Sequence, residues 1–233
     1  MGQYFRGCIL TGKYLNDKPI QFCPWDWDNG AKLMEHSYER NTMAKCFAYQ
    51  LALSSEEYPV RAAWVGDYAD EYLFSYPPDP EMTDIINDPD RFKALVTMYV
   101  KCWCLNGDDD AREALFDIKR PDDFKDLEFE YNTPIYVANL DKKEYILTYP
   151  DDPPREYEVS RLNLLLAAFN GAGGSYYGNN MDMVGRWAGD RLIAELNGGF
   201  PEDEITWFRR RLEKHGYDLD DFTELKIEFI EKY

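Results

Sequence analysis

The segment from Arg161 to Leu196 constrains the fold more than any other, because two apolar runs in it flank a glycine-rich loop. The loop at 170–180 contains four glycines and a Tyr-Tyr pair. Glycine permits backbone angles and close approaches that a side chain would block. The first run, residues 161–169, fits a helix or a strand, and the loop together with the second run favours a pair of strands. We therefore expect two strands here.

The rest of the chain mixes strand and helix signals without regular alternation. Strands are expected where short apolar runs end in turn residues, and helices where a capping residue precedes an apolar stripe of helical period. The expected strands cover residues 3–10, 19–22, 60–65, 134–139, 144–149 and 225–233. The expected helices run from Asn41 to Leu53, from Asp88 and Pro89 to Asn106, from Asp110 to Ile118, and from Pro201 to Gly216. This mixture predicts one α+β domain over residues 1–233, with a mixed or antiparallel sheet and several packed helices.

The net charge of the chain is strongly negative. Asp and Glu number 44 and Lys and Arg number 26, which gives a formal charge of −18 at pH 7. Such a surface repels the phosphates of DNA and RNA and the headgroups of anionic membranes. It attracts cations and the basic surfaces of other proteins. We therefore expect a partner protein with a basic surface, and neither direct nucleic-acid binding nor membrane binding.

Cysteine and histidine usage indicates a reducing compartment and no metal centre. The chain has five Cys, an odd number, and its N-terminus has no long apolar leader, which together predict a cytoplasmic location with free thiols. Cys102 and Cys104 are too close for the usual zinc spacing, and only two His are present. We expect neither a metal nor a cofactor. No apolar run reaches the ~18 residues of a membrane span.

The glycine-rich loop matches no nucleotide-binding template. Counted from Gly171, the third glycine of a Rossmann fingerprint would fall at Tyr176, and the Lys-Ser/Thr of a Walker loop is missing. Gly173 and Gly174 therefore either connect two strands or expose backbone N–H groups that cradle an anion. In the second case Tyr176 would stack on a ring of the ligand.

Glu35 and His36 are candidate acid–base residues. An imidazole such as that of His36 can act as a general base near neutral pH, and a neighbouring acid can tune it. Adjacent residues on a helix or a strand point apart, however, so a hydrogen-bonded structural His is the alternative interpretation.

Three aspartates lie where strand ends are expected. Asp67 and Asp70 directly follow the strand at 60–65, and Asp190 comes shortly after Trp187. Carboxylates at strand ends suit metal or acid–base chemistry, but turns also favour Asp for local reasons. The chain contains no Ser-His-Asp, HExxH or CxxC pattern, so these aspartates are ligand-binding candidates without an assigned reaction.

Two aromatic-rich loops are candidates for partner recognition. Trp25 and Trp27 alternate with aspartates in the first, and Tyr177 lies in the glycine-rich loop. Large aromatic side chains dominate recognition surfaces, and they also dominate cores, so both interpretations stay open.

Several motifs spread over most of the chain resemble a group of uncharacterised bacterial and phage proteins. The motifs are Met1-Gly-Gln-Tyr4, Lys32-Leu-Met-Glu-His-Ser-Tyr38, Trp64-Val-Gly-Asp-Tyr-Ala-Asp70 and, after the glycine-rich loop, Val184-Gly-Arg-Trp-Ala-Gly-Asp-Arg191. Ala172 and Ser175 depart from the group's more glycine-rich loop. The resemblance implies a mobile-element setting and transfers no activity or catalytic residue.

Two functional hypotheses follow. In the first, the protein is an acidic cytoplasmic binding protein of phage type, whose partner is a protein with a basic groove and which inhibits a host defence or nucleic-acid-binding protein. In the second, it binds a nucleotide or hydrolyses a small molecule, using the glycine-rich loop with His36 and Asp67, which must then converge on one concave site. A structural subunit of a phage particle is a third possibility.

Overall fold

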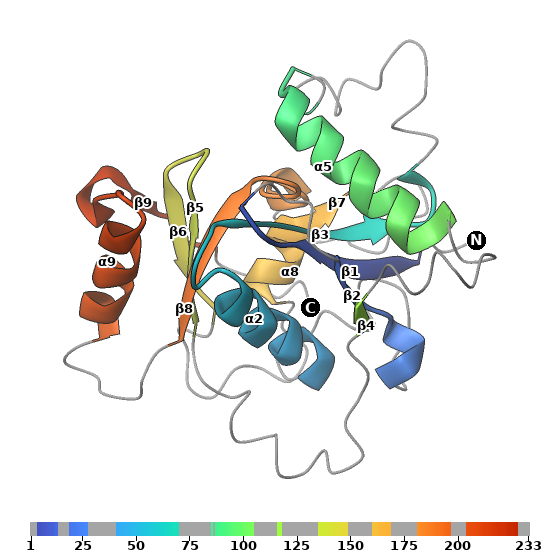
Figure 1. Ribbon diagram of the computed structural model, residues 1–233, viewed down its shortest axis with the longest axis horizontal. Helices are drawn as coiled ribbons and strands as arrows, with labels where there is room; N and C mark the ends of the chain where they lie inside the picture. The colour runs from blue at the N-terminus through green and yellow to red at the C-terminus, as the bar shows by residue number, and fades with distance from the viewer. Residues whose placement is uncertain are drawn as a thin grey trace, which may run out of the picture.

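Figure 1 shows a mixed β-sheet with helices on both of its faces, in a computed structural model of the chain. The structure describes residues 4–13, 19–27, 41–69, 85, 87–104, 116–117, 135–148, 160–168, 181–196 and 204–227. Within these ranges there are four α-helices and nine strands, and all nine strands belong to one sheet. The predicted α+β class with a mixed sheet is confirmed.

The strand order of the sheet is β4-β2-β1-β3-β8-β5-β6-β9, with β7 paired to β3. The strands are β1 (Phe5–Leu10), β2 (Ile20–Phe22), β3 (Val60–Gly66), β4 (Phe116–Asp117), β5 (Ile135–Asn139), β6 (Glu144–Leu147), β7 (Ala167–Ala168), β8 (Arg191–Leu196) and β9 (Thr223–Glu224). Most pairs are antiparallel, and the short strands β4, β7 and β9 join in parallel.

The centre of the sheet is buried on both faces. All seven residues of β3 are buried, which is typical of a strand with a packed layer on each side. Trp64 packs into the larger core with α2 (Thr42–Ser54) and α8 (Arg161–Leu166), while its neighbours Ala63 and Val65 pack under α5 (Pro89–Tyr99). Figure 1 shows α2 and α5 on opposite sides of β1 and β3.

On the face that carries α5, the core is divided into two apolar clusters. One lies under α5 and includes Leu95, and the other lies under α9 (Glu204–Lys214) and includes Phe208. Arg61 of β3 and its register partner Arg191 of β8 are charged positions between these clusters. The division places a polar region at the start of β3.

Local capping signals set the starts of two helices as predicted. The side chain of Asn41 accepts hydrogen bonds from the first N–H groups of α2, and Asp88 does the same for α5, with Pro89 at the first helical position. Helix α5 continues into the π-helical turn η3 (Val100–Cys104), and its predicted end at Asn106 lies outside the described residues.

Three sequence expectations are wrong. The run at 161–169 is a helix that Ser160 caps, followed by the two strand residues of β7, which pair with β3 and not with β8. An unbroken Leu-rich run carries no alternation to separate a helix from a buried strand, so the cap decides. Residues 116–117 form a strand rather than part of a helix. At the C-terminal end, strand pairing covers Thr223–Glu224, whereas residues 225–227 are not in a strand.

Within the described ranges, no helix combines the length and the apolar character needed to cross a membrane.

Candidate functional site

The structure describes four of the residues that the sequence singled out, namely Trp25, Trp27, Asp67 and Asp190. The other candidates lie outside the described residues: Glu35, His36, Asp70, Gly173, Gly174, Tyr176 and Tyr177. The four described residues fall at two places, one at each end of β3.

Trp25 and Trp27 have opposite environments although they are two residues apart. Both belong to the 3₁₀ turn η1 (Pro24–Trp27), in which side chains two positions apart point in widely different directions. Trp27 is 3% exposed and stacks on Phe22, with 6.2 Å between ring centroids. Trp25 is 49% exposed. Of the two interpretations, the core applies to Trp27, which is buried, and Trp25 is the exposed member of the pair.

Trp25 belongs to a cluster of rings around one arginine, which we call the tryptophan platform: Tyr4, Arg6, Trp25 and Trp103. The ring centroid of Trp25 lies 5.9 Å from that of Tyr4 and 6.3 Å from that of Trp103. The guanidinium carbon of Arg6 lies 4.4 Å from the Trp103 centroid and 5.3 Å from that of Trp25, within the range of cation–π attraction.

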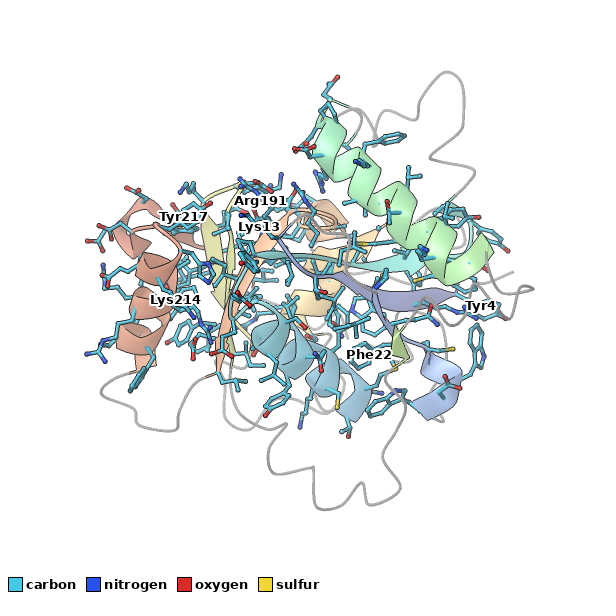
Figure 2. The ribbon with its side chains drawn as sticks, viewed as in Figure 1. Tyr4, Lys13, Phe22, Arg191, Lys214 and Tyr217 are labelled. Carbon is cyan, nitrogen blue, oxygen red and sulfur yellow. The ribbon has the colours of Figure 1, made fainter. Side chains whose placement is uncertain are left out.

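Two hydrogen bonds to the backbone hold the platform in place. The Arg6 guanidinium donates to the carbonyl oxygen of Cys102, and the indole N–H of Trp103 donates to the carbonyl of Val65 at 3.0 Å. The four side chains come from the start of β1, from η1 and from η3, so the tertiary fold assembles them. Figure 2 shows Tyr4 at the outer end of the sheet.

Carboxylates lie beside the platform. The Oδ1 atom of Asp67 accepts the backbone N–H of Tyr4 at 3.0 Å, and the N–H of Asp67 donates to the Tyr4 carbonyl at 2.9 Å. Asp67 thereby extends the β1–β3 ladder by one residue pair, and this pairing accounts for an Asp at the strand end. Asp26, next to Trp25 in the chain, is exposed. The local surface thus combines exposed rings with negative charge.

Asp190 lies in a different environment at the other end of β3. Its carboxylate is 1% exposed and contacts the Nε of Arg91 at 3.1 Å, the Nδ2 of Asn139 at 2.7 Å and the Nζ of Lys142 at 3.7 Å. Burial raises the pKa of Asp190, while the charge of Arg91 and the hydrogen bond from Asn139 oppose that rise. We call these four residues the Asp190 network.

The Asp190 network fixes the turn that precedes β8. Besides contacting Asp190, Arg91 donates hydrogen bonds to the carbonyls of Gly185, Arg186 and Ala188. Gly189 has φ +79°, and a Cβ there would approach the side chain of Leu95 to 2.8 Å. The turn therefore needs glycine both for its backbone angle and for its close packing against α5.

Two further ion pairs tie the same turn and β8 to the β5–β6 hairpin. Arg186 pairs with Glu144, which also accepts the indole N–H of Trp187 at 2.8 Å. Asp141 accepts the backbone N–H of Arg191 at 2.8 Å and its Nε at 2.7 Å. The Val184–Arg191 motif is thus explained by packing and hydrogen bonding within the fold.

The two described aspartates do not share a site. In the register of the sheet, Gly66 at one end of β3 lies opposite Phe5 of β1, and Arg61 at the other end lies opposite Arg191 of β8. Six residues of strand at ~3.3 Å each separate Asp67 from the region of Asp190 by roughly 20 Å. Figure 2 shows the labelled Tyr4 and Arg191 in different parts of the molecule. Within the part of the chain that the structure describes, no three His, Cys, Asp or Glu side chains are arranged to hold a metal ion.

Sequence reasoning missed Tyr4, Arg6 and Trp103. One signal was present, because Arg6 is a charged residue inside the apolar strand Phe5–Leu10 and such a residue needs a partner. The identity of that partner, 96 positions away at Cys102, was not readable from local patterns.

Comparison of the chain with protein-family models, with curated proteins and with solved structures finds no match.

Proposed function

We propose that the protein binds a partner protein through the tryptophan platform, and that a basic side chain of the partner stacks on the platform's exposed rings. The observation that carries the proposal is the exposure of Trp25, which is half open to solvent although its neighbours hold it in a defined arrangement. Exposed aromatic anchors of this kind contribute most of the affinity of many protein interfaces.

Charge favours a cationic partner. The chain carries a net charge of −18, Asp26 is exposed and follows Trp25 in the chain, and the carboxylate of Asp67 accepts the backbone N–H of Tyr4. An arginine of the partner can stack on an aromatic face and also pair with a carboxylate, and its planar guanidinium suits both contacts better than a lysine ammonium does. The long-range field of the acidic surface also speeds the encounter with a basic protein.

The platform is organised before a partner binds. Arg6 is held between Trp25 and Trp103 by its bond to the Cys102 carbonyl, so the rings have little freedom left to lose on binding. Binding to an ordered surface avoids part of the entropy cost of association.

The experiment is a titration with an oligo-arginine peptide, followed by fluorescence anisotropy of a dye on the peptide. Trp25→Ala is expected to weaken binding about 30-fold, because loss of a central anchor costs about 2 kcal/mol. Trp207→Ala is the matched control, since Trp207 is 50% exposed but lies on α9. An oligo-lysine peptide of equal charge is expected to bind more weakly. Equal affinities for the wild type and both variants would contradict the proposal, because only nonspecific charge attraction would then remain.

The finer form of the proposal is that the partner's basic segment normally binds nucleic acid, as expected for an inhibitor of phage type. Protamine bound to duplex DNA is a suitable probe, because its arginine-rich chain binds the phosphate backbone. The wild-type protein is expected to release the DNA, and Trp25→Ala to release much less. Release that is equal for both would contradict this form of the proposal.

The nucleotide-binding hypothesis stays a prediction, because Asp67 is the only one of its named residues that the structure describes. A thermal-shift titration with nucleotides tests it. A ligand at 100 times its Kd would stabilise the protein by about 2.7 kcal/mol.

A further inference from the structure

Two buried cysteines lie beneath the tryptophan platform. Cys8 is on β1 and Cys102 is in η3, and both side chains are fully buried in the apolar cluster under α5. Neither takes part in a disulfide. The two residues are 94 positions apart in the chain, so their meeting is a product of the tertiary fold.

Hydrogen bonds to the backbone hold η3, which carries Cys102, against the strands β1 and β3, of which β1 carries Cys8. Side chains two apart on a strand point to the same face, so Arg6 and Cys8 share the face covered by η3. Arg6 donates to the carbonyl of Cys102 itself. On the neighbouring strand, Trp103 donates to the carbonyl of Val65, the register partner of Arg6. Both side chains lie in the same buried apolar cluster, and the Cys102 thiol is close enough to raise the pKa of Cys8.

We propose that Cys8 and Cys102 are a redox-modifiable pair that closes to a disulfide when the protein meets hydrogen peroxide. One sulfur is first oxidised to a sulfenic acid and the peroxide releases one water. The thiol of the second cysteine then displaces the hydroxyl as a second water, and the S–S bond forms. The pair loses two electrons and two protons, and the peroxide is reduced to two waters. A dithiol reverses the bond by exchange.

Burial and the neighbouring thiol set how readily the pair reacts. The Cys102 thiol and burial both raise the pKa of Cys8, so the protonated thiol predominates at neutral pH. The thiolate is the reactive form, and below the pKa its fraction rises about tenfold per pH unit. Disulfide formation is therefore expected to be slow at pH 7 and about tenfold faster at pH 8.

Closing the bond would alter the platform above it. A disulfide demands a closer approach and a defined dihedral angle at its two sulfurs, which moves Cys102 relative to β1. The carbonyl of Cys102 holds Arg6, and Trp103 follows directly in the chain. Oxidation is thus expected to shift the emission of the platform tryptophans. The disulfide itself does not depend on the proposed function, since it can form whether or not the platform binds a basic partner.

The experiment treats the intact protein with hydrogen peroxide at pH 7 and at pH 8, then alkylates the remaining thiols in denaturant and digests without reduction. Mass spectrometry is expected to find a peptide pair joined through Cys8 and Cys102, which dithiothreitol removes. Cys46 is the matched control, because it is also buried but belongs to α2 on the opposite face of the sheet. Cys46→Ala is expected to retain the link, and Cys102→Ala to abolish it.

Three results would overturn the proposal. They are alkylation of both Cys8 and Cys102 after prolonged oxidation, a link from Cys8 to Cys23 instead, or sulfinic acid at either position without a link. The measurement on the wild-type chain is sufficient by itself, so the proposal can be tested even if a cysteine variant fails to fold.

Discussion

The two ends of β3 carry charged residues that serve different purposes. At the Gly66 end, Arg6 lies between rings and Trp25 is half exposed. At the Val60 end, Asp190 is almost fully buried, and contacts with Arg91, Asn139 and Lys142 satisfy its carboxylate. A fully partnered buried charge has no capacity left for a ligand, whereas an exposed ring in a fixed position does. We therefore assign folding stability to the Asp190 network, and we propose binding for the platform.

Asp190→Asn is expected to have the largest effect, a loss of about 3–5 kcal/mol of unfolding free energy. The substitution replaces one of the two acceptor oxygens by an NH2 group, which would face a donor of Arg91 or Asn139, and it leaves the buried Arg91 without its charge partner. Urea denaturation measures the loss. Asp218→Asn is the control, because Asp218 forms an exposed pair with Arg209, and its loss is expected to cost at most about 1 kcal/mol. Equal losses in the two variants would remove the distinction between the ends of β3.

Arg6→Met is expected to cost about 1.5–3 kcal/mol of stability, because it removes a hydrogen bond from a charged group to the Cys102 carbonyl. It is also expected to weaken oligo-arginine binding, since Trp25 and Trp103 lose the group between them. The control is Arg210→Met. In the wild type, the guanidinium of Arg210 lies 5.2 Å from the exposed ring of Trp207 on the same helix. Arg210→Met should change stability by less than about 0.5 kcal/mol. If Arg210→Met lost as much stability as Arg6→Met, the contacts of Arg6 with the platform would not be special, which would contradict the account.

Acid is expected to destabilise the protein partly through Glu144. Burial acts to raise the pKa of Glu144, but the bonds from Arg186 and Trp187 outweigh it, so the pKa lies below its usual value. A lowered pKa gives stability that is present above the unfolded value of about 4.3 and is lost as the pH falls through the folded value. Asp190, whose pKa burial raises, acts in the opposite direction.

Glu144→Gln tests this pH dependence. The urea midpoint of the wild type is expected to fall between pH 6 and pH 3, and the fall in the variant should be smaller because one titrating carboxylate is gone. Asp141, whose pKa the bonds from Arg191 lower against the effect of burial, should account for part of the remaining fall. An unchanged fall in Glu144→Gln would contradict a stabilising role for this pair.

Sequence patterns predicted the local features of the fold better than its assembled ones. Asn41 and the Asp88-Pro89 pair act within one helical turn, so their capping roles were readable from the sequence. The different burial of Trp25 and Trp27 could not be predicted from the sequence, because it depends on the orientation of a short 3₁₀ turn against the core.

The candidate site was predictable only in part for the same reason. An aspartate near the start of β8 was recognised as notable, but its structural role comes from Arg91 and Asn139, which lie 99 and 51 positions away. In the platform, Trp25 was recognised and Arg6 was not, since the rings that contact Arg6 belong to other segments.

The most direct test measures both stability and oligo-arginine affinity for Trp25→Ala and Asp190→Asn. We predict that Trp25→Ala loses about 30-fold in affinity and less than about 1 kcal/mol of stability, and that Asp190→Asn shows the reverse, with an affinity within about twofold of the wild type wherever it is folded. If each variant lost stability and affinity in the same proportion, binding would simply follow folding, and the assignment of separate roles to the two ends of β3 would be wrong.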